Sequence, residues 1–208
     1  MAQRSLVAIV LIVCVGYFAI WACAPSMNVR PSVPVATGQT KEYGLGVGAR
    51  SRAYRRMDTP DPIGVAWWSS RFGASDGYRF GTALSFNPFP GLNVSLGTRL
   101  HETPGSSLWL EGELSLPGLR LSAPMAVALT PNTWFYMNPG FVAGAILDIG
   151  KGSSAGGHWQ LPLGIAHWAP DRSWSLRVEG GLLTSDPANR GENSYFYGGI
   201  GLAFPYGN

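Results

Sequence analysis

Lysine is almost absent from this sequence. Of the 15 basic residues only Lys41 and Lys151 are lysine, the other thirteen being arginine, and charged residues make up 13% of the chain. This charged fraction is about half that of an average soluble protein. Soluble β proteins commonly protect their edges and outer faces with lysine. A chain so poor in lysine therefore has little strand surface facing water.

Cysteine is also scarce. Cys14 and Cys23 both lie in an N-terminal apolar segment, and the rest of the chain has none. This excludes a disulfide framework and a cysteine metal site from the main domain. His158 and His167 are nine residues apart, so a strand would place them on opposite faces, which disfavours a shared metal ion. We therefore predict no metal and no cofactor.

The N-terminus carries an export signal. Arg4 precedes an apolar run from Leu6 to Ala22, and a basic residue, an apolar stretch and a small residue describe a secretory signal. The run is also about long enough to span a bilayer, so residues 1–22 are a signal peptide or a membrane anchor. Either form exports the chain. Residues 23–40 are rich in proline and small polar residues, which predicts a flexible tether.

The end of this apolar run resembles the bacterial lipoprotein signal. Ile20-Trp21-Ala22-Cys23 places an aliphatic residue shortly before a cysteine, although Trp21 stands where a small residue is usual. The resemblance implies that Cys23 becomes the lipidated N-terminus. A plain signal peptide, cut near Ala22 or Ala24, and an uncleaved anchor helix are the two other interpretations.

From Lys41 onward the chain alternates between apolar and small or polar residues. One segment places Leu108, Leu110 and Leu114 on one face and Trp109, Glu111 and Glu113 on the other. A period of two predicts a strand with two unlike faces. Pro117-Gly118 predicts a two-residue loop after this strand, with Leu114 opposite Leu121.

The alternation recurs about ten times, in segments of roughly ten residues, the length that a tilted strand needs to cross a bilayer. Residues 134–148 are apolar nearly throughout, with Pro139-Gly140 as a kink or turn. The longest predicted connections, 51–61, 149–157 and 184–192, fall on one side, as in outer-membrane barrels. The predicted fold class is all-β: over residues 41–208, an antiparallel up-and-down meander closed into a transmembrane β-barrel of about ten strands (roughly 8–12), preceded by an N-terminal apolar helix.

The two strand faces differ in chemistry. One is built from large apolar residues, and the other holds Gly, Ala and Ser with isolated charges. The charged members of the second face are Arg99, Glu111, Glu113, Arg120, Arg177 and Glu179. A membrane barrel turns the apolar face to lipid and pairs such charges inside, which predicts a structural ion network in the lumen. A soluble, lipocalin-like barrel would instead turn the apolar face inward around an apolar ligand.

Aromatic residues are expected in two places. Those that can occupy the interior are Trp68, Trp109, Tyr195 and Tyr197. Those near strand ends fit girdles at the membrane interfaces: Tyr43, Trp67, Tyr78, Phe86, Trp134, Trp159, Trp174 and Phe204. Because a ten-stranded barrel is narrow, we expect its lumen to be mostly filled by side chains rather than open.

The main domain resembles the small outer-membrane β-barrel proteins of Gram-negative bacteria. The last strand, from Tyr195 to Phe204, is similar to their C-terminal assembly signal, with Gly199, apolar Leu202 and aromatic Phe204 at its end. The resemblance implies export to the outer membrane of the cell envelope and contact with outer-membrane lipid and the barrel assembly machinery. We expect a structural, anchoring or interaction role and no enzyme activity.

Two further groups of residues are candidate sites. Arg50, Arg52, Arg55 and Arg56 form the densest basic run, which as an outer loop could bind lipopolysaccharide phosphates or another envelope protein. No nucleic-acid-binding fold signal accompanies this run. His101, with Glu102 and Ser106 nearby, has the residue types of a Ser-His-acid hydrolase. A lipid-modifying hydrolase is therefore an alternative function.

Overall fold

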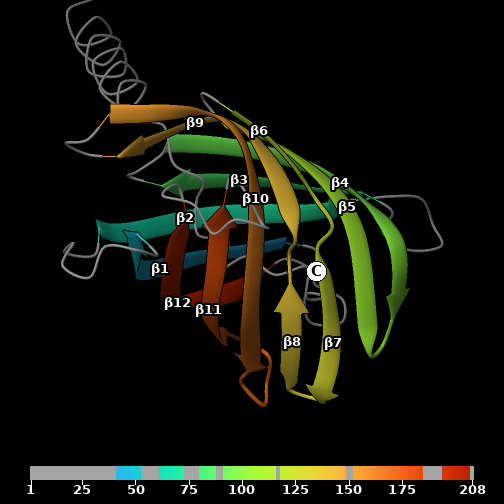
Figure 1. Ribbon diagram of the computed structural model, residues 1–208. Coiled ribbons are helices and arrows are strands. Elements are labelled where there is room, and N and C mark those ends of the chain that lie inside the picture. The colour runs from blue at the N-terminus through green and yellow to red at the C-terminus, as the bar shows by residue number, and fades with distance from the viewer. Residues whose placement is uncertain are drawn as a thin grey trace, which may run out of the picture.

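The computed structural model describes residues 41–52, 61–72, 80–87, 91–115, 118–148, 152–184 and 194–206. Within them, twelve strands form one antiparallel sheet (Figure 1). The strands are β1 (Lys41–Arg52), β2 (Asp61–Phe72), β3 (Phe80–Asn87), β4 (Gly91–Thr103), β5 (Ser106–Ser115), β6 (Gly118–Ser122), β7 (Met125–Thr130), β8 (Thr133–Met137), β9 (Gly140–Asp148), β10 (Gly152–Trp168), β11 (Ser175–Thr184) and β12 (Tyr195–Tyr206). In the same residues, no helix is long and apolar enough to cross a membrane.

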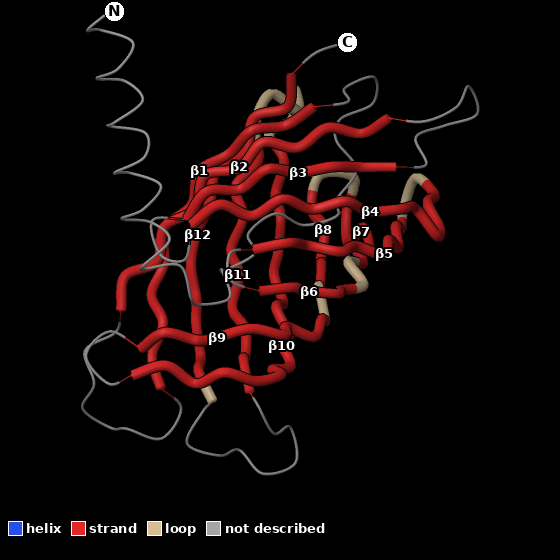
Figure 2. Tube along the Cα trace, turned by 90° about the horizontal axis from the view of Figure 1, so that it is seen from above, coloured by secondary structure: helices blue, strands red, loops and turns tan. Residues whose placement is uncertain are grey.

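The sheet closes into a barrel. Its ring runs from β1 to β6, continues through β9, β10, β11 and β12, and returns to β1, where Lys41 pairs with Tyr206. Figure 2 shows the two walls of this barrel, with β3, β4, β5 and β6 crossing β11 and β12 at a steep angle. We name the rim at which β1 begins and β12 ends the terminal rim, and the opposite rim the distal rim.

Two long strands are each interrupted at a proline. β7 continues β6 and β8 leads into β9, because β5 pairs with both β6 and β7, and β10 pairs with both β9 and β8. Across the gap, the Ala123 amide donates to the Pro139 carbonyl at 2.9 Å and the Trp109 amide donates to the Pro124 carbonyl at 2.8 Å. Proline has no N–H to donate, so the ladder is interrupted at Pro124 and at Pro139. The described chain therefore makes ten barrel strands, which confirms the predicted fold class.

Side chains alternate between the two faces as the period of two predicts. On β11, for example, Leu176 and Val178 are exposed while Ser175, Arg177 and Glu179 are buried. The buried side of the sheet is the barrel interior, which holds charged, polar and aromatic side chains. Most of the large aliphatic residues face outward.

Three local predictions are wrong. On β2, Trp67 is 3% exposed and faces the interior, while Trp68 faces outward, because two adjacent tryptophans leave the phase of this strand ambiguous. In the β5–β6 hairpin, Leu114 lies opposite Leu119 rather than Leu121, a shift of two residues that keeps the same faces. Most of the loop predicted at 149–157 is strand, since β10 begins at Gly152 and pairs with β9.

Several predictions fall outside the described residues. These are the signal or anchor at 1–22, the tether at 23–40 with Cys23, and Arg55 and Arg56 of the basic run. Arg50 and Arg52 belong to β1 rather than to a loop, and their side chains are not described.

Candidate functional site

The outer face of the barrel is apolar over all described strands of the ring. Leu45, Leu96, Leu121, Val178 and Ile200 are between 51% and 64% exposed, although a soluble protein would bury residues of this kind. The charged residues lie on the other side of the same strands: Glu42, Glu111, Glu113, Glu179, Arg120 and Arg177 are all at most 8% exposed. The orientation of the apolar and charged faces is therefore the reverse of that in a soluble barrel. The chain is a membrane-spanning β-barrel. A lipocalin-like barrel is thereby contradicted, because its apolar face would line the lumen.

Aromatic side chains border the apolar face at both rims. At the terminal rim, Tyr43 stacks on Phe204 with ring centroids 5.4 Å apart, and the Trp68 indole donates a hydrogen bond to the Tyr206 hydroxyl. Toward the distal rim, Phe141 and Trp159 meet edge to face at 5.3 Å. Such belts are typical of membrane–water interfaces.

The predicted girdle needs two corrections. Trp67 and Trp134 are only 3% and 6% exposed and lie inside the barrel, whereas Trp68, predicted inside, lies outside. Tyr43, Trp159 and Trp174 are exposed as predicted. Tyr78 lies outside the described residues, and the side chain of Phe86 is not described.

The terminal half of the interior is held by an ion pair. The Arg177 Nη2 atom on β11 lies 2.5 Å from the Glu42 Oε2 atom on β1, and the two side chains are 0% and 4% exposed. The Trp67 indole donates to the other oxygen of Glu42 at 3.1 Å. The Arg177 guanidinium also lies over the Trp67 and Trp168 rings, 5.4 and 6.0 Å from their centroids. Each group in this set therefore satisfies another, as buried charges require.

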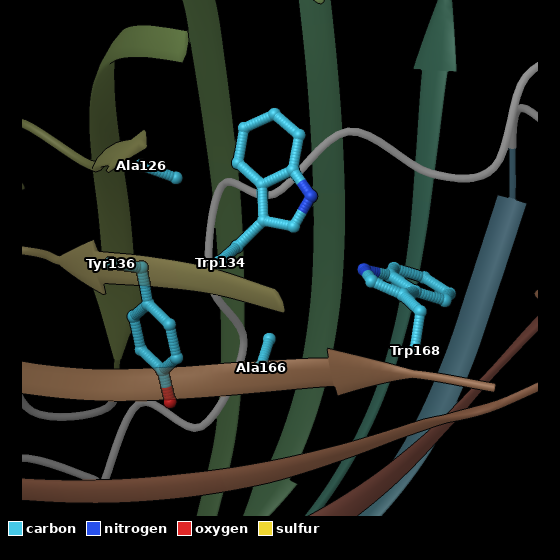
Figure 3. Close-up of a cluster of buried hydrophobic side chains, with 5 residues drawn as sticks. All are labelled: Ala126, Trp134, Tyr136, Ala166 and Trp168. Atoms are coloured by element: carbon cyan, nitrogen blue, oxygen red, sulfur yellow. The ribbon is translucent and has the colours of Figure 1, made fainter. Parts of the chain in front are cut away.

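Beside this ion pair lies a cluster of apolar side chains (Figure 3). Trp134 and Trp168 project into the interior from β8 and from the end of β10, next to Ala126, Ala166 and Tyr136. All five residues are at most 6% exposed. The cluster fills part of the interior near the terminal rim.

Glycines make room for the large interior side chains. A Cβ atom at Gly44 would overlap the Trp67 ring, and one at Gly164 would overlap the Tyr136 ring. Each aromatic ring therefore lies flat against the backbone of a neighbouring strand. This explains why glycine recurs on the inward face of the barrel.

A second charged group lies in the distal half. The Arg120 Nη2 atom donates to the Asn138 carbonyl at 2.9 Å, beside the strand break at Pro139, and Arg120 Nη1 lies 3.9 Å from the Glu113 carboxylate. Glu179 lies next to the hydroxyls of Tyr136 and Tyr197. Arg120 thus stabilises the break by occupying a carbonyl that faces the lumen.

The structure brings some of the predicted network together and separates other members. Glu113 and Arg120 pair, whereas Arg177 pairs with Glu42, which is not among the predicted members of the network. Arg99 lies near the terminal rim, 3.5 Å from Glu102. The signal for Glu42 was its position, two residues before Gly44 and therefore on the same inward face.

The hydrolase candidates are only partly assembled. His101 Nε2 lies 3.2 Å from Ser106 Oγ, beside a β-bulge between Arg99 and His101. Glu102, the expected acid, is instead paired with Arg99. Among the described residues, no group of three or more His, Cys, Asp or Glu is placed to hold a metal ion.

No protein-family model and no curated protein sequence matches this chain. Among solved structures it is similar to the NanC porin, at 8% identity and a TM-score of 0.44, covering 78% of this chain and 98% of that chain. It is also similar to Ail, the attachment invasion locus protein of Yersinia pestis, at 9% identity, a TM-score of 0.39 and coverage of 81% and 97%. The N-terminal β-barrel domain of Pseudomonas aeruginosa OprF gives 11% identity, a TM-score of 0.39 and coverage of 82% and 100%. The likeness is one of barrel outline, so the membrane assignment rests on the outward-facing side chains of this chain.

Proposed function

We propose that this chain is an exported outer-membrane β-barrel with a structural, anchoring or interaction role. The observation that carries the proposal is the inversion of its faces, with Leu45 and Leu96 64% and 61% exposed while Arg177 is completely buried. Only helices and closed barrels satisfy their backbone groups in lipid. Transmembrane β-barrels of the outer-membrane type are antiparallel, with an even number of strands.

The interior of this barrel is closed by its own side chains. Trp67, Tyr136 and Tyr197 lie against glycines of neighbouring strands, and the Glu42–Arg177 pair spans the space between β1 and β11. These contacts favour a plugged barrel over a diffusion pore. A bilayer conductance recording tests this: steady, large-amplitude channels from the purified chain would rule out the plug.

The barrel is held to the membrane in two ways. Lipid contact along the apolar face is the first, and acyl chains on Cys23 of the N-terminal segment are the second. The basic run Arg50, Arg52, Arg55 and Arg56, at and beyond the distal end of β1, would bind phosphates of lipopolysaccharide from the outer leaflet. The distal rim would then be the partner surface.

Heat-modifiable migration of the full chain tests the central proposal. The folded barrel should need detergent to stay in solution and should migrate faster on a gel before boiling than after it. Cys23→Ser is the matched variant for lipidation: it should keep the heat-modifiable shift and lose incorporation of labelled fatty acid. A chain that is monomeric without detergent, or that mild salt releases from membranes, would refute membrane insertion.

A further inference from the structure

Three prolines weaken the sheet on adjacent strand pairs of the barrel wall. Each accepts a hydrogen bond at its carbonyl from the residue opposite, at 2.8, 2.9 and 3.1 Å: Trp109 donates to Pro124, Ala123 to Pro139 and Asn138 to Pro162. In a hydrogen-bonded antiparallel pair, the two residues exchange two such bonds. Because proline has no N–H, each of these pairs keeps only one of them. We name this row of three pairs the proline seam.

The proline seam continues into β4 as a β-bulge. The bulge lies between Arg99 and His101, and Arg99 pairs with Trp109, the residue at the β5 end of the seam. A bulge leaves an extra residue unpaired and bends its strand. Four adjacent strand pairs, from β4 to β10, are therefore irregular along one line that crosses the wall. The wall can bend along such a line with a small loss of backbone hydrogen bonds.

Arg120 replaces one of the missing donors at the seam. Pro162 has no N–H for the Asn138 carbonyl, and the Arg120 Nη2 atom donates to this carbonyl instead, at 2.9 Å. Backbone hydrogen bonds weaken steeply when the strands that carry them move out of alignment. A long side chain such as Arg120 has several rotatable bonds, so its contact with Asn138 can persist while the strands change their angle. The seam thus has a contact that tolerates bending.

On the terminal side of the proline seam, β7 and β8 form a hairpin with few attachments to its neighbours. β7 pairs with β5 at three positions, Ser106–Leu108, and β8 pairs with five residues of β10. The Ala128 amide also donates to the Gly105 carbonyl at 2.8 Å, and Thr133 Oγ1 lies 2.9 Å from His167 Nδ1. By comparison, β1 pairs with β12 over twelve residues. The hairpin is therefore the part of the wall that separates from its neighbours most easily.

This hairpin carries part of the group that fills the interior near the terminal rim. Trp134 and Tyr136 of β8 are buried in one cluster with Ala166 and Trp168 of β10 (Figure 3). Trp134 is four residues from Asn138 at the seam, which corresponds to about 13 Å along the strand. Tyr136 is only two residues from Asn138. A swing of the hairpin about the seam would therefore displace Trp134 more than Tyr136.

We propose that the β7–β8 hairpin is a gate at the terminal rim, which swings on the proline seam. In the closed state, which the structure holds, Trp134 lies in the cluster with Trp168. In the open state the hairpin separates from β5 and takes Trp134 out of the cluster, so that water reaches the polar interior from the terminal rim. The gate is a property of the barrel wall and does not depend on what the chain binds.

Hydrogen exchange of the full chain in detergent micelles tests the gate. Exchange is followed by mass spectrometry of proteolytic fragments, which separate residues 125–137 from β11 and β12. Amides of the hairpin should exchange through local opening, at least tenfold faster than those of β11 and β12, while the rest of the barrel stays protected. Equal protection of the hairpin and of β11 would overturn the proposal.

Two prolines provide a matched pair of variants. Pro139→Ala restores an N–H that can donate to the Ala123 carbonyl across the seam, whereas Pro131→Ala makes the same change in the turn between β7 and β8. Pro139→Ala should slow the exchange of the hairpin by about fivefold, because one hydrogen bond across the seam is regained. Pro131→Ala should not slow it. Equal slowing by both variants would contradict the seam as the hinge.

A disulfide between β5 and β7 should lock the gate. Leu108 and Met125 lie opposite each other in the sheet, and opposite residues of an antiparallel pair are close enough for a disulfide. The variant Leu108→Cys with Met125→Cys also carries Cys14→Ser and Cys23→Ser, so that the two new thiols have only each other as partners. Oxidation should slow the exchange of the hairpin to nearly that of β11, and reduction should restore it. Unchanged exchange in the oxidised chain would refute separation from β5.

Folding of each variant is checked separately from opening. The heat-modifiable shift on a gel reports the closed barrel, so a change in exchange with the shift retained concerns the gate alone. If the double cysteine variant does not fold, the unmodified chain and the two proline variants still decide the proposal.

Discussion

Ile200 offers the sharpest test of which face of the barrel meets lipid. It is 52% exposed on β12, midway between Phe196 and Phe204, which are each four residues away. Its neighbours across the sheet are Val47 and Val178, both exposed. At about 3.4 Å per residue and a tilt near 40°, four residues correspond to about 10 Å along the barrel axis. Ile200 therefore lies near the middle of an apolar belt about 20 Å tall, close to the height known for membrane barrels.

Replacing Ile200 with arginine should destabilise the barrel strongly in lipid. An arginine facing lipid at the bilayer midplane costs about 2–4 kcal/mol, and one near the interface costs about 0–1 kcal/mol. Leu129→Arg is the matched control, because Leu129 is 59% exposed but lies at the end of β7, next to the turn at Pro131 and Asn132. The free energy of unfolding is measured by guanidinium titration of the chain in lipid vesicles, followed by tryptophan fluorescence.

The test compares the free energies of unfolding of the two variants. On a surface facing water, exchanging an exposed aliphatic residue for arginine changes stability by only about 0.5 kcal/mol in either direction. Ile200→Arg and Leu129→Arg would then behave alike. Equal, small effects of the two substitutions would therefore refute the assignment of the outer face to lipid.

Substitutions at Glu42, at two glycines and at Ser106 also have expected outcomes. Glu42→Gln should cost about 3–5 kcal/mol in the free energy of unfolding, because it removes the carboxylate that pairs with the buried Arg177 guanidinium, and the double change Glu42→Gln with Arg177→Met should recover much of that loss in a double-mutant cycle. Gly164→Ala should cost about 1–3 kcal/mol because its methyl group would overlap a tyrosine ring. Gly112→Ala, where no atom lies within 4 Å of the added carbon, should be neutral or stabilising. Ser106→Ala should leave the hydrolysis of a chromogenic ester unchanged; a serine-dependent rate above background would revive the hydrolase alternative.

The faces of most strands follow from sequence alone, and the exceptions have physical reasons. A period of two is unambiguous where large and small residues alternate, as in β11 and β12. It fails at Trp67 and Trp68, since both are large and aromatic and either could face outward. The start of β10 was assigned to a loop because residues 152–157 are glycine, serine and alanine. Such a segment has little strand propensity of its own, and here it is held by its pairing with β9.

The strand breaks also show that pairing between strands decides features that the local sequence does not predict. Pro124 and Pro139 each remove one donor, and a local rule would end a strand at either residue. The two prolines instead lie beside each other in a hairpin whose register is unchanged across the gap. The guanidinium of Arg120 binds the Asn138 carbonyl at that point. Neither the shared register nor the bound carbonyl can be derived from a single segment.

The partners within the interior depend on the same non-local geometry. The alternation of side chains along each strand shows that Arg177 and Glu42 both face inward. It does not show which residues are neighbours: in the sheet, Arg177 pairs with Gly201 on β12, and Gly201 pairs with Gly46 on β1. Because neither glycine has a side chain, the arginine can extend across β12 and reach Glu42 on β1. These two glycines therefore determine which oppositely charged side chains can reach each other in the lumen.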